Sequence, residues 1–389
     1  MTGGAAAGHA ASHPGSHAGG QPAMRRLRLS PTLTNYIARQ YLFWFCSFFF
    51  AIVAIIFLAT IVDLLDRLAT KEVALSVTLK MALLKLPYLS QEVMPFTVLF
   101  AAMATFWRLT RSHELVVARA AGVSVWQFLL PVLGSSVVIG GLAVAALNPL
   151  SSILLSRYER LEASLIHNQG SMLAVSETGL WLRQADASGQ SVIHAERVKP
   201  GSVSLQQVTV FRYADQDRFV DRIDAREAQL QRGRWLLFDV WLARPGAASE
   251  FHEELALPTD LTADNIQDRF APPETISFWN LPGFIDLMQA AGFSATPHRL
   301  QFHRLLALPM LFAAMVLLAA TFSLRPQRRG RVGVVILAGM LTGFLLYFLS
   351  NFVFAIGLSG TIPVVLAAWT PAGVSLMLGV AMLLHLEDG

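Results

Sequence analysis

Residues 108–122, RLTRSHELVVARAAG, lie between hydrophobic runs that are long enough to cross a lipid bilayer. Outward from this basic segment, neither residues 41–62, YLFWFCSFFFAIVAIIFLATIV, nor residues 123–147 contain a charged side chain. A transmembrane helix needs about 20 consecutive apolar residues, and both runs meet that length. The sequence therefore predicts a membrane-embedded fold with a short basic segment at the membrane surface.

The composition leads to the same prediction. Hydrophobic residues make up 54% of the 389 residues and charged residues 14%, and the mean hydropathy is +0.50. These values are too apolar for a single soluble domain. The pI of 9.4 does not indicate nucleic acid as a partner, because the basic residues form short clusters beside the hydrophobic runs instead of an exposed face. Cys46 is the only cysteine, which excludes a disulfide within the chain.

Hydrophobic windows recur six times, in two groups of three. They cover residues 41–62, 84–107, 123–147, 305–324, 332–358 and 361–384. Residues 148–304 between the groups are polar, with short alternating stretches bounded by turn-forming residues, at 179–183, 203–212 and 234–242. The spacing suits a sandwich or jelly roll. The sequence thus predicts an α+β membrane protein with six transmembrane helices (3+3) and a β-jelly-roll domain inserted between the third and the fourth.

The short loops predict the orientation, because Lys and Arg accumulate on the cytoplasmic side of a membrane. Arginines cluster before the first span, between the second and third, and between the fourth and fifth. These are Arg25, Arg26, Arg28 and Arg39, then Arg108, Arg111 and Arg119, then Arg325, Arg328, Arg329 and Arg331. All three clusters fall on one side of a six-helix protein. We therefore expect cytoplasmic termini and a β domain outside, in the periplasm of a cell with two membranes.

These expectations divide the chain into four parts. They are a disordered cytoplasmic tail at 1–30, transmembrane helices 1–3 at 31–147, the β domain at 148–304 and transmembrane helices 4–6 at 305–389. The tail lacks the aromatic residues and the periodicity that a core requires. Its histidines have a spacing that would suit a metal on a helix, but glycines and a proline surround them, which favours a solvated tail.

The sequence carries no enzyme signature. A Gly-rich phosphate-binding loop ending in Lys-Ser/Thr is absent, and no Gly-x-Ser-x-Gly motif follows a strand. The histidines of the β domain lack short metal-ligand spacing. We therefore expect no catalytic residue, metal or cofactor, and a role in transport or signalling.

Residues 111–122 have the pattern of a short amphipathic helix. Ser112 suits an N-cap and Gly122 a C-terminal stop. Between them, apolar and charged side chains alternate so that one side of the helix is apolar and the other charged. A solvated loop helix, or one lying on the membrane surface, accounts for this periodicity equally well.

The segment from Ser112 to Ser124, SHELVVARAAGVS, resembles the coupling-helix signature of the LptF/LptG family of lipopolysaccharide-export ABC permeases. The resemblance covers about residues 33–386 and is carried by the segments 179–183, 192–198, 305–324, 339–349, 362–363 and 367–371. Within the family, these details are more similar to LptG than to LptF.

The resemblance implies a permease subunit of an ATP-driven exporter that extracts lipopolysaccharide from the bacterial inner membrane and passes it to a periplasmic bridge. The implied partners are a paralogous LptF-like permease, a cytosolic LptB-like ATPase dimer that hydrolyses the ATP, and an LptC-like periplasmic jelly-roll protein with one membrane helix. It assigns coupling to the ATPase to Glu114, Leu115, Val116, Arg119 and Gly122. In this assignment, Glu114 pairs with an Arg of the ATPase groove and Leu115 and Val116 pack into that groove.

A phosphate-bearing lipid requires cations near the outer rim of the membrane. The candidate lipid-binding residues are Arg67, Lys71, Arg157 and Arg160 for the phosphates, with Phe49 and Phe348 for the acyl chains. Asp63 and Asp66 flank Arg67 and weaken its positive field. Anchoring of helix ends at the interface would explain these basic residues equally well.

Two further features lie inside the spans. Glu92 lies in the second span, where an ionisable group usually faces a cavity or a partner, although near the outer surface it would simply be exposed. Glycines at 339, 343 and 357 permit the close approach of another helix, in a moving gate or in ordinary tight packing. An alternative function also fits the pattern, namely a mechanotransmitting subunit of an ATPase complex that activates a periplasmic partner without carrying lipid.

Overall fold

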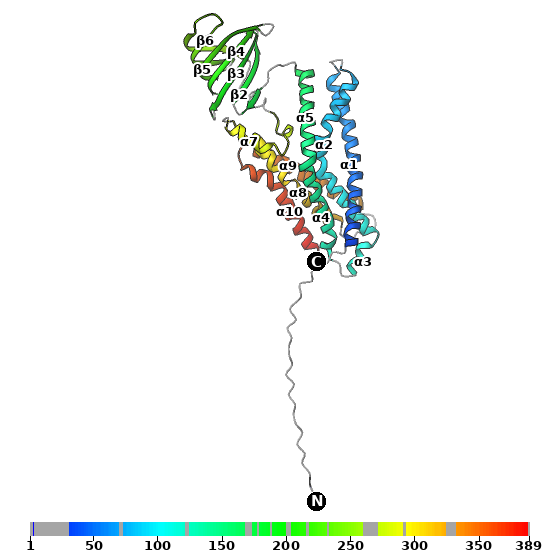
Figure 1. The fold of residues 1–389 in the computed structure, drawn as a ribbon. Helices are drawn as coiled ribbons and strands as arrows, with labels where there is room; N and C mark the ends of the chain where they lie inside the picture. Colours follow the sequence, from blue (N-terminus) through cyan, green and yellow to red (C-terminus); the bar gives the residue numbers. More distant parts are fainter. Residues whose placement is uncertain are drawn as a thin grey trace.

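The computed structural model of the protein consists of a bundle of long helices with a β-sheet at one end (Figure 1). It describes residues 3, 31–69, 73–120, 124–167, 173–176, 179–186, 189–199, 204–214, 218–231, 233–259, 271–290, 293–323 and 332–387. The tail predicted at 1–30 lies outside these residues, apart from Gly3.

Six helices in the described ranges are long and apolar enough to span a membrane. The first group consists of α1 (Pro31–Leu68), α2 (Leu75–Arg111) and one continuous helix made of α4 (Val125–Leu142), η1 (Ala143–Leu147), α5 (Asn148–Glu162) and η2 (Ala163–His167). The second group consists of α8 (Thr296–Ser323), α9 (Val332–Leu358) and α10 (Val364–Glu387). The predicted 3+3 arrangement is confirmed.

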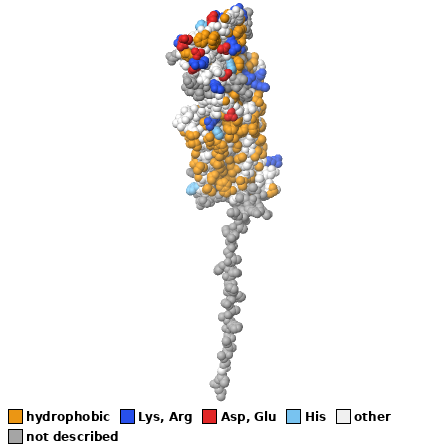
Figure 2. All heavy atoms as spheres, turned by 60° about the vertical axis from the view of Figure 1, so that its left-hand side comes forward, with side chains coloured by type: hydrophobic (Ala, Val, Ile, Leu, Met, Phe, Trp, Pro, Cys, Tyr) orange, Lys and Arg blue, Asp and Glu red, His pale blue; other side chains and the backbone are white. Residues whose placement is uncertain are grey.

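Helices α2 and α8 form the centre of the bundle. Their most apolar segments are 61% and 67% buried, whereas those of α1 and α9 are only 11% and 17% buried. The shared core contains large side chains such as Phe106, Leu129 and Phe312. Figure 2 shows hydrophobic side chains covering one side of the bundle, while charged side chains gather on the β domain. Helices α1 and α9 therefore present most of their apolar surface outward, to lipid or to a partner.

Within the described residues, seven antiparallel strands follow α5, and consecutive strands pair with each other. They are β1 (Leu173–Ser176), β2 (Gly179–Asp186), β3 (Gly189–Lys199), β4 (Ser204–Ala214), β5 (Arg218–Gln231), β6 (Arg234–Ala243) and β7 (Glu250–Pro258). The predicted strands at 179–183, 203–212 and 234–242 correspond to β2, β4 and β6. The described strands form a meander, and the strand exchange between sheets that defines a jelly roll is not found among them.

The sheet curls around an apolar inner face. The Gln184 side chain on β2 donates to the Pro258 carbonyl at 3.0 Å and accepts from the Thr259 hydroxyl at 2.7 Å. These bonds bring strand β2 close to the end of β7, although four strands lie between them in the sheet order. Helix α7 (Leu281–Ala290) adds Ile285 and Met288 to the core of the sheet, and so connects the β domain to the start of α8.

Two helices extend past the boundaries expected for the β domain at 148 and 304. The third membrane helix continues without a break to Leu165, and α8 already begins at Thr296. At 1.5 Å per residue, a helix of 41 residues is roughly 60 Å long, about twice the thickness of the hydrocarbon core. Hydropathy marks where a helix leaves the lipid and not where the helix ends, because polar residues also form helices in water.

A π-helical turn joins this long helix to the segment that returns from the sheet. Within η1, the Ala145 carbonyl accepts a hydrogen bond from the Trp279 indole at 3.1 Å. The buried Asn148 side chain accepts another from the Phe278 backbone amide at 2.8 Å. A π turn frees backbone groups that an α-helix would use internally, and here one of these groups anchors the return of the chain.

Candidate functional site

The two surfaces that the sequence singled out lie at opposite ends of the bundle. Helix α3 (Glu114–Ala120) connects α2 to α4 at one end, and the sheet follows α5 at the other (Figure 1). The start of α1 lies at the α3 end, because the Tyr36 hydroxyl donates to Glu114 Oε1 at 3.4 Å. The C-terminal end of α10 lies there as well (Figure 1).

Helix α3 is shorter than predicted because α2 extends to Arg111. Ser112 caps the C-terminal end of α2, and its hydroxyl donates to the Arg108 carbonyl at 3.0 Å. His113 then adopts a φ of +59°, a left-handed conformation that turns the chain. The expected N-cap of the coupling helix is therefore the C-cap of the preceding helix, since a serine side chain can bond a backbone carbonyl as well as an amide.

The Glu114–Ala120 helix faces the bundle with a different side from the one expected. Leu115 is only 7% exposed and belongs to the apolar core of its own chain, so it cannot pack into a partner's groove in this conformation. Val117 is 68% exposed instead. Sequence periodicity over seven residues cannot tell which apolar side faces the bundle. The side chains of Val116 and Arg119, and the whole of Gly122, lie outside the described residues.

At the sheet end, the ends of α1, α2 and α5 pack together through an apolar cluster. Leu64, Met81, Leu155 and Tyr158 are buried in it. This packing brings Arg67 of α1 to the same end of the bundle as Arg157 and Arg160 of α5, and all three are exposed. Lys71 lies outside the described residues.

The charges at this rim are partly balanced. Arg67 pairs with Asp63 at 3.0 Å, and both side chains are about half exposed. For Arg157 and Arg160, no ion pair is found within the described ranges. Lys85 is a further cation at this end, and its Nζ lies 5.0 Å from the centre of the Tyr158 ring. It is the second residue of the hydrophobic window 84–107, so hydropathy alone does not separate it from the span.

The two candidate apolar residues differ in their surroundings. Phe49 is partly buried on α1 and stacks on Phe45, with 5.9 Å between the ring centres. Phe348 on α9 is 64% exposed. Phe49 thus packs within its own chain, while Phe348 is available to lipid or to a second polypeptide.

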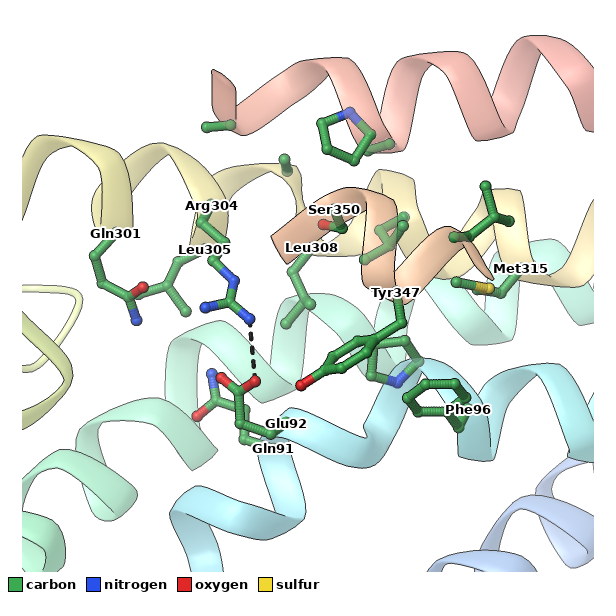
Figure 3. Close-up of a pocket in the computed structure, with 17 residues that line it drawn as sticks. Gln91, Glu92, Phe96, Gln301, Arg304, Leu305, Leu308, Met315, Tyr347 and Ser350 are labelled. Atoms are coloured by element: carbon green, nitrogen blue, oxygen red, sulfur yellow. Dashed lines mark hydrogen bonds and ion pairs between the residues drawn. The ribbon is translucent and has the colours of Figure 1, made fainter. Parts of the chain in front are cut away.

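An interior pocket lies between α2, α8, α9 and α10, with a volume of about 70 Å³ (Figure 3). Its polar lining contains Gln91, Glu92, Gln301, Arg304 and Tyr347. Arg304 donates to Glu92 Oε2 at 3.0 Å, and the guanidinium lies 5.1 Å from the centre of the Phe354 ring on α9. The prediction that Glu92 faces a cavity or a partner agrees with this geometry.

Arg304 is the partner that the sequence did not identify. It precedes the fourth hydrophobic window by one residue and was therefore assigned to the β domain. In the structure, it lies within α8, where its side chain and that of Glu92 are 31% and 25% exposed. Arg299 and Arg304 both lie in the first turns of α8, and nothing in the local sequence distinguishes the one that pairs with Glu92.

Comparison with known proteins gives consistent matches over most of the chain. The family described as "Lipopolysaccharide export system permease LptF/LptG" matches residues 35–385. The "Lipopolysaccharide export system permease protein LptG" of Escherichia coli K12 is 24% identical over 311 residues, which is 78% of this chain and 84% of the relative. The protein of the same description from Haemophilus influenzae is 21% identical over 301 residues, covering 74% and 80%. Together with the six helices and the inserted sheet, these matches show that the chain belongs to the LptF/LptG family of lipopolysaccharide export permeases.

Proposed function

We propose that this chain is a permease subunit of an ATP-driven lipopolysaccharide exporter that extracts lipopolysaccharide from the inner membrane and passes it to a periplasmic bridge. The family is one of export permeases, which is a transport role and not an enzymatic one. One observation carries the proposal. In a chain of this family, α3 and the β domain lie at opposite ends of a six-helix bundle (Figure 1).

The proposed orientation places α3 and both termini in the cytoplasm. Arg108 and Arg111 lie at the α3 end, and so does Arg39 near the start of α1. Short loops on the cytoplasmic side are enriched in Lys and Arg. The β domain is then periplasmic, and the chain is a multi-pass inner membrane protein.

The cytosolic ATPase would act on the exposed side of α3. Glu114 and Val117 are at least partly accessible there, while Leu115 ties α3 to α1 and α2 through the core. An exposed ion pair contributes only about 0–1 kcal/mol, so Glu114 alone cannot carry a mechanical load. Instead, the buried Leu115 would pass movement of α3 on to the membrane helices.

A paralogous LptF-like permease would cover the exposed apolar faces of this chain. The most apolar segments of α1 and α9 are largely unburied, and α9 exposes Phe344, Leu345, Phe348 and Phe352. A lipid chamber between two permease subunits would be lined by such faces. Lipopolysaccharide would enter there, with its phosphates near Arg157 and Arg160 at the outer rim.

The β domain would pass the lipid on to an LptC-like partner. The edge strands of the described sheet are β1 and β7. Edge strands carry unpaired backbone groups that accept another strand, so a second β-sheet domain can extend this sheet. The apolar inner face of the curled sheet would then continue into the partner.

The experiment that tests the proposal is photocrosslinking in the complete ATPase–permease complex, reconstituted with lipopolysaccharide. Photoreactive residues replace Phe348, Arg157 or, as a control on the other end of the bundle, Val117. We expect ATP-dependent capture of lipopolysaccharide at positions 348 and 157, and capture of the ATPase at position 117. Capture of protein alone at all three positions would favour the mechanotransmitting subunit and reject export by this chain.

A further inference from the structure

Helix α9 lies against α2 along one antiparallel seam. Gly339 faces Met103, Gly343 faces Leu99, and Tyr347 faces Phe96. A Cβ atom added to Gly343 would lie 2.4 Å from Leu99 Cδ2, and one added to Gly339 would lie 2.5 Å from Met103 Cε. The rings of Phe96 and Tyr347 are 5.1 Å apart. The seam therefore depends on two glycines and one ring pair.

The polar end of this seam contains a charged contact that joins three helices. Arg304 of α8 donates to Glu92 of α2, and the centre of its guanidinium lies 5.1 Å from the Phe354 ring of α9. One cation thus contacts a carboxylate on one side and an aromatic ring on the other. A cation near an aromatic ring is worth about 0.5–1 kcal/mol in exposed sites and about 2 kcal/mol when desolvated.

The depth of the pair indicates the surroundings in which it acts. Glu92 precedes the end of α2 at Arg111, and Arg304 precedes the end of α8 at Ser323, by the same nineteen residues. At 1.5 Å per residue this is roughly 28 Å from the α3 end, close to the full thickness of a hydrocarbon core of about 30 Å. The pair therefore lies near the level where hydrocarbon gives way to headgroups on the sheet side.

The lining of the pocket below the pair changes from polar to apolar with depth. Gln301 is 5% exposed, lines the pocket beside Arg304, and its Oε1 has no hydrogen-bond partner among the described residues. Towards the α3 end, α8 contributes Leu308, Leu311 and Met315. A lipid of the outer leaflet is polar and apolar in the same order, with its headgroup on the sheet side and its acyl chains towards the α3 end. Movement of α9 away from α2 would expose this lining to the bilayer.

From these contacts we propose that Arg304 is a positioning residue, which latches α9 onto α2 by pairing with Glu92 and stacking on Phe354. Helix α9 is the helix that needs this contact, because its apolar segment is only 17% buried. Glycines occupy two positions of its seam with α2, and they contribute no side chain to the packing. The glycines allow α9 to approach α2 closely, whereas the charged contact fixes the position of α9 relative to α2. The proposal rests on the proposed function in one respect: the movement of α9 would serve to admit lipid.

The test is disulfide trapping across the seam in the full-length chain, purified with its partner subunits. Leu99→Cys and Gly343→Cys are introduced together in a Cys46→Ser background, because Cys46 is the only native cysteine. Replacing Leu99 also removes the side chain that the new group at 343 would meet. The readout is the trapped fraction after a fixed exposure to a mild oxidant, with no lipopolysaccharide present.

We expect Phe354→Leu to lower the trapping rate by about threefold, the change that losing one cation–π contact would produce. Arg304→Gln should lower it further, and Arg304→Lys should retain most of it because the charge remains. The matched controls are Leu358→Ala on α9, one turn beyond Phe354, and Arg299→Gln on α8; both side chains are exposed, and both variants should leave trapping unchanged.

Unchanged trapping in both Phe354→Leu and Arg304→Gln would overturn the proposal. Phe354→Leu preserves the Arg304–Glu92 pair, so the test stands even if Arg304→Gln prevents folding. Equal loss in Phe354→Leu and Leu358→Ala would also overturn it, because general loosening of α9 would then explain the result. Trapping is measured without lipid, so the two proposals can fail separately. If the export proposal is wrong, the complex captures no lipid while the Arg304 variants still change the trapping rate.

Discussion

The hydroxyl of Tyr36 donates a hydrogen bond to Glu114 Oε1 across 78 residues of sequence, at 3.4 Å. It connects the first turns of α1 to the start of α3. The bond is long and exposed, and it is therefore a weak tether, worth less than about 1 kcal/mol. Glu114 is consequently free to exchange Tyr36 for a basic group of a partner.

Glu114→Ala should leave membrane insertion and thermal stability unchanged but lower ATP-driven lipid release, because the partner loses a carboxylate. The measurement is lipopolysaccharide release and ATP hydrolysis by the reconstituted complex. Tyr36→Phe is the matched control, since it removes the same hydrogen bond and keeps the carboxylate. Release at the wild-type rate by Glu114→Ala would remove this residue from coupling.

Truncation of Leu115 should affect stability, whereas truncation of Val117 should affect binding of the ATPase. Leu115→Ala opens a cavity in the core, and removal of a buried leucine costs about 2–5 kcal/mol. We expect a lower unfolding temperature for the purified chain. Val117→Ala, on the exposed side, should leave that temperature unchanged and reduce co-purification of the ATPase. The opposite pattern would mean that α3 presents a different face to its partner.

The rim arginines should differ in their importance for lipid binding. Arg157→Gln combined with Arg160→Gln should weaken lipopolysaccharide capture by at least about tenfold, the loss expected for one or more charge-assisted hydrogen bonds. Arg67→Gln should have a smaller effect, because Asp63 already pairs with that cation. Photocrosslinking from Phe348 provides the measurement. An equal loss in Arg67→Gln and in the variant with both Arg157→Gln and Arg160→Gln would contradict this difference between the rim arginines.

Asn148→Ala should destabilise the fold without touching either proposed binding surface. It removes the acceptor for the Phe278 amide at a buried position, and an unsatisfied buried donor costs about 1–3 kcal/mol. The unfolding temperature of the purified chain should fall, while ATPase co-purification persists. Ser164→Ala, at an exposed hydroxyl further along the same helix, is the matched control and should have no effect.

The sequence was most informative where the signal is local. Runs of apolar residues identified six spans, because the length of a membrane helix is set by the bilayer and not by its neighbours in the fold. Alternation of polarity identified β2, β4 and β6 in the same way. By contrast, the end of the long third helix was missed, since polar residues continue a helix in water as readily as apolar residues do in lipid.

For the candidate site, the sequence located the segment but not its faces. It selected Leu115 and Val116 as the contact surface, and the structure turns Leu115 inward and Val117 outward. It predicted that Glu92 faces a cavity or a partner, but it did not identify that partner. The partner, Arg304, lies 212 residues away in the sequence, and the periodicity of either segment does not indicate a contact between them.

The amino-acid sequence alone thus determined the number of spans, the inserted strands and the basic segment that marks one membrane surface. All of these follow from hydrophobicity and charge over some ten to twenty neighbouring residues. Only the tertiary structure decided which side of α3 is buried, where Arg304 meets Glu92 and how α9 rests on α2. These contacts depend on how helices distant in the chain pack together, because burial and pairing are properties of the assembled bundle.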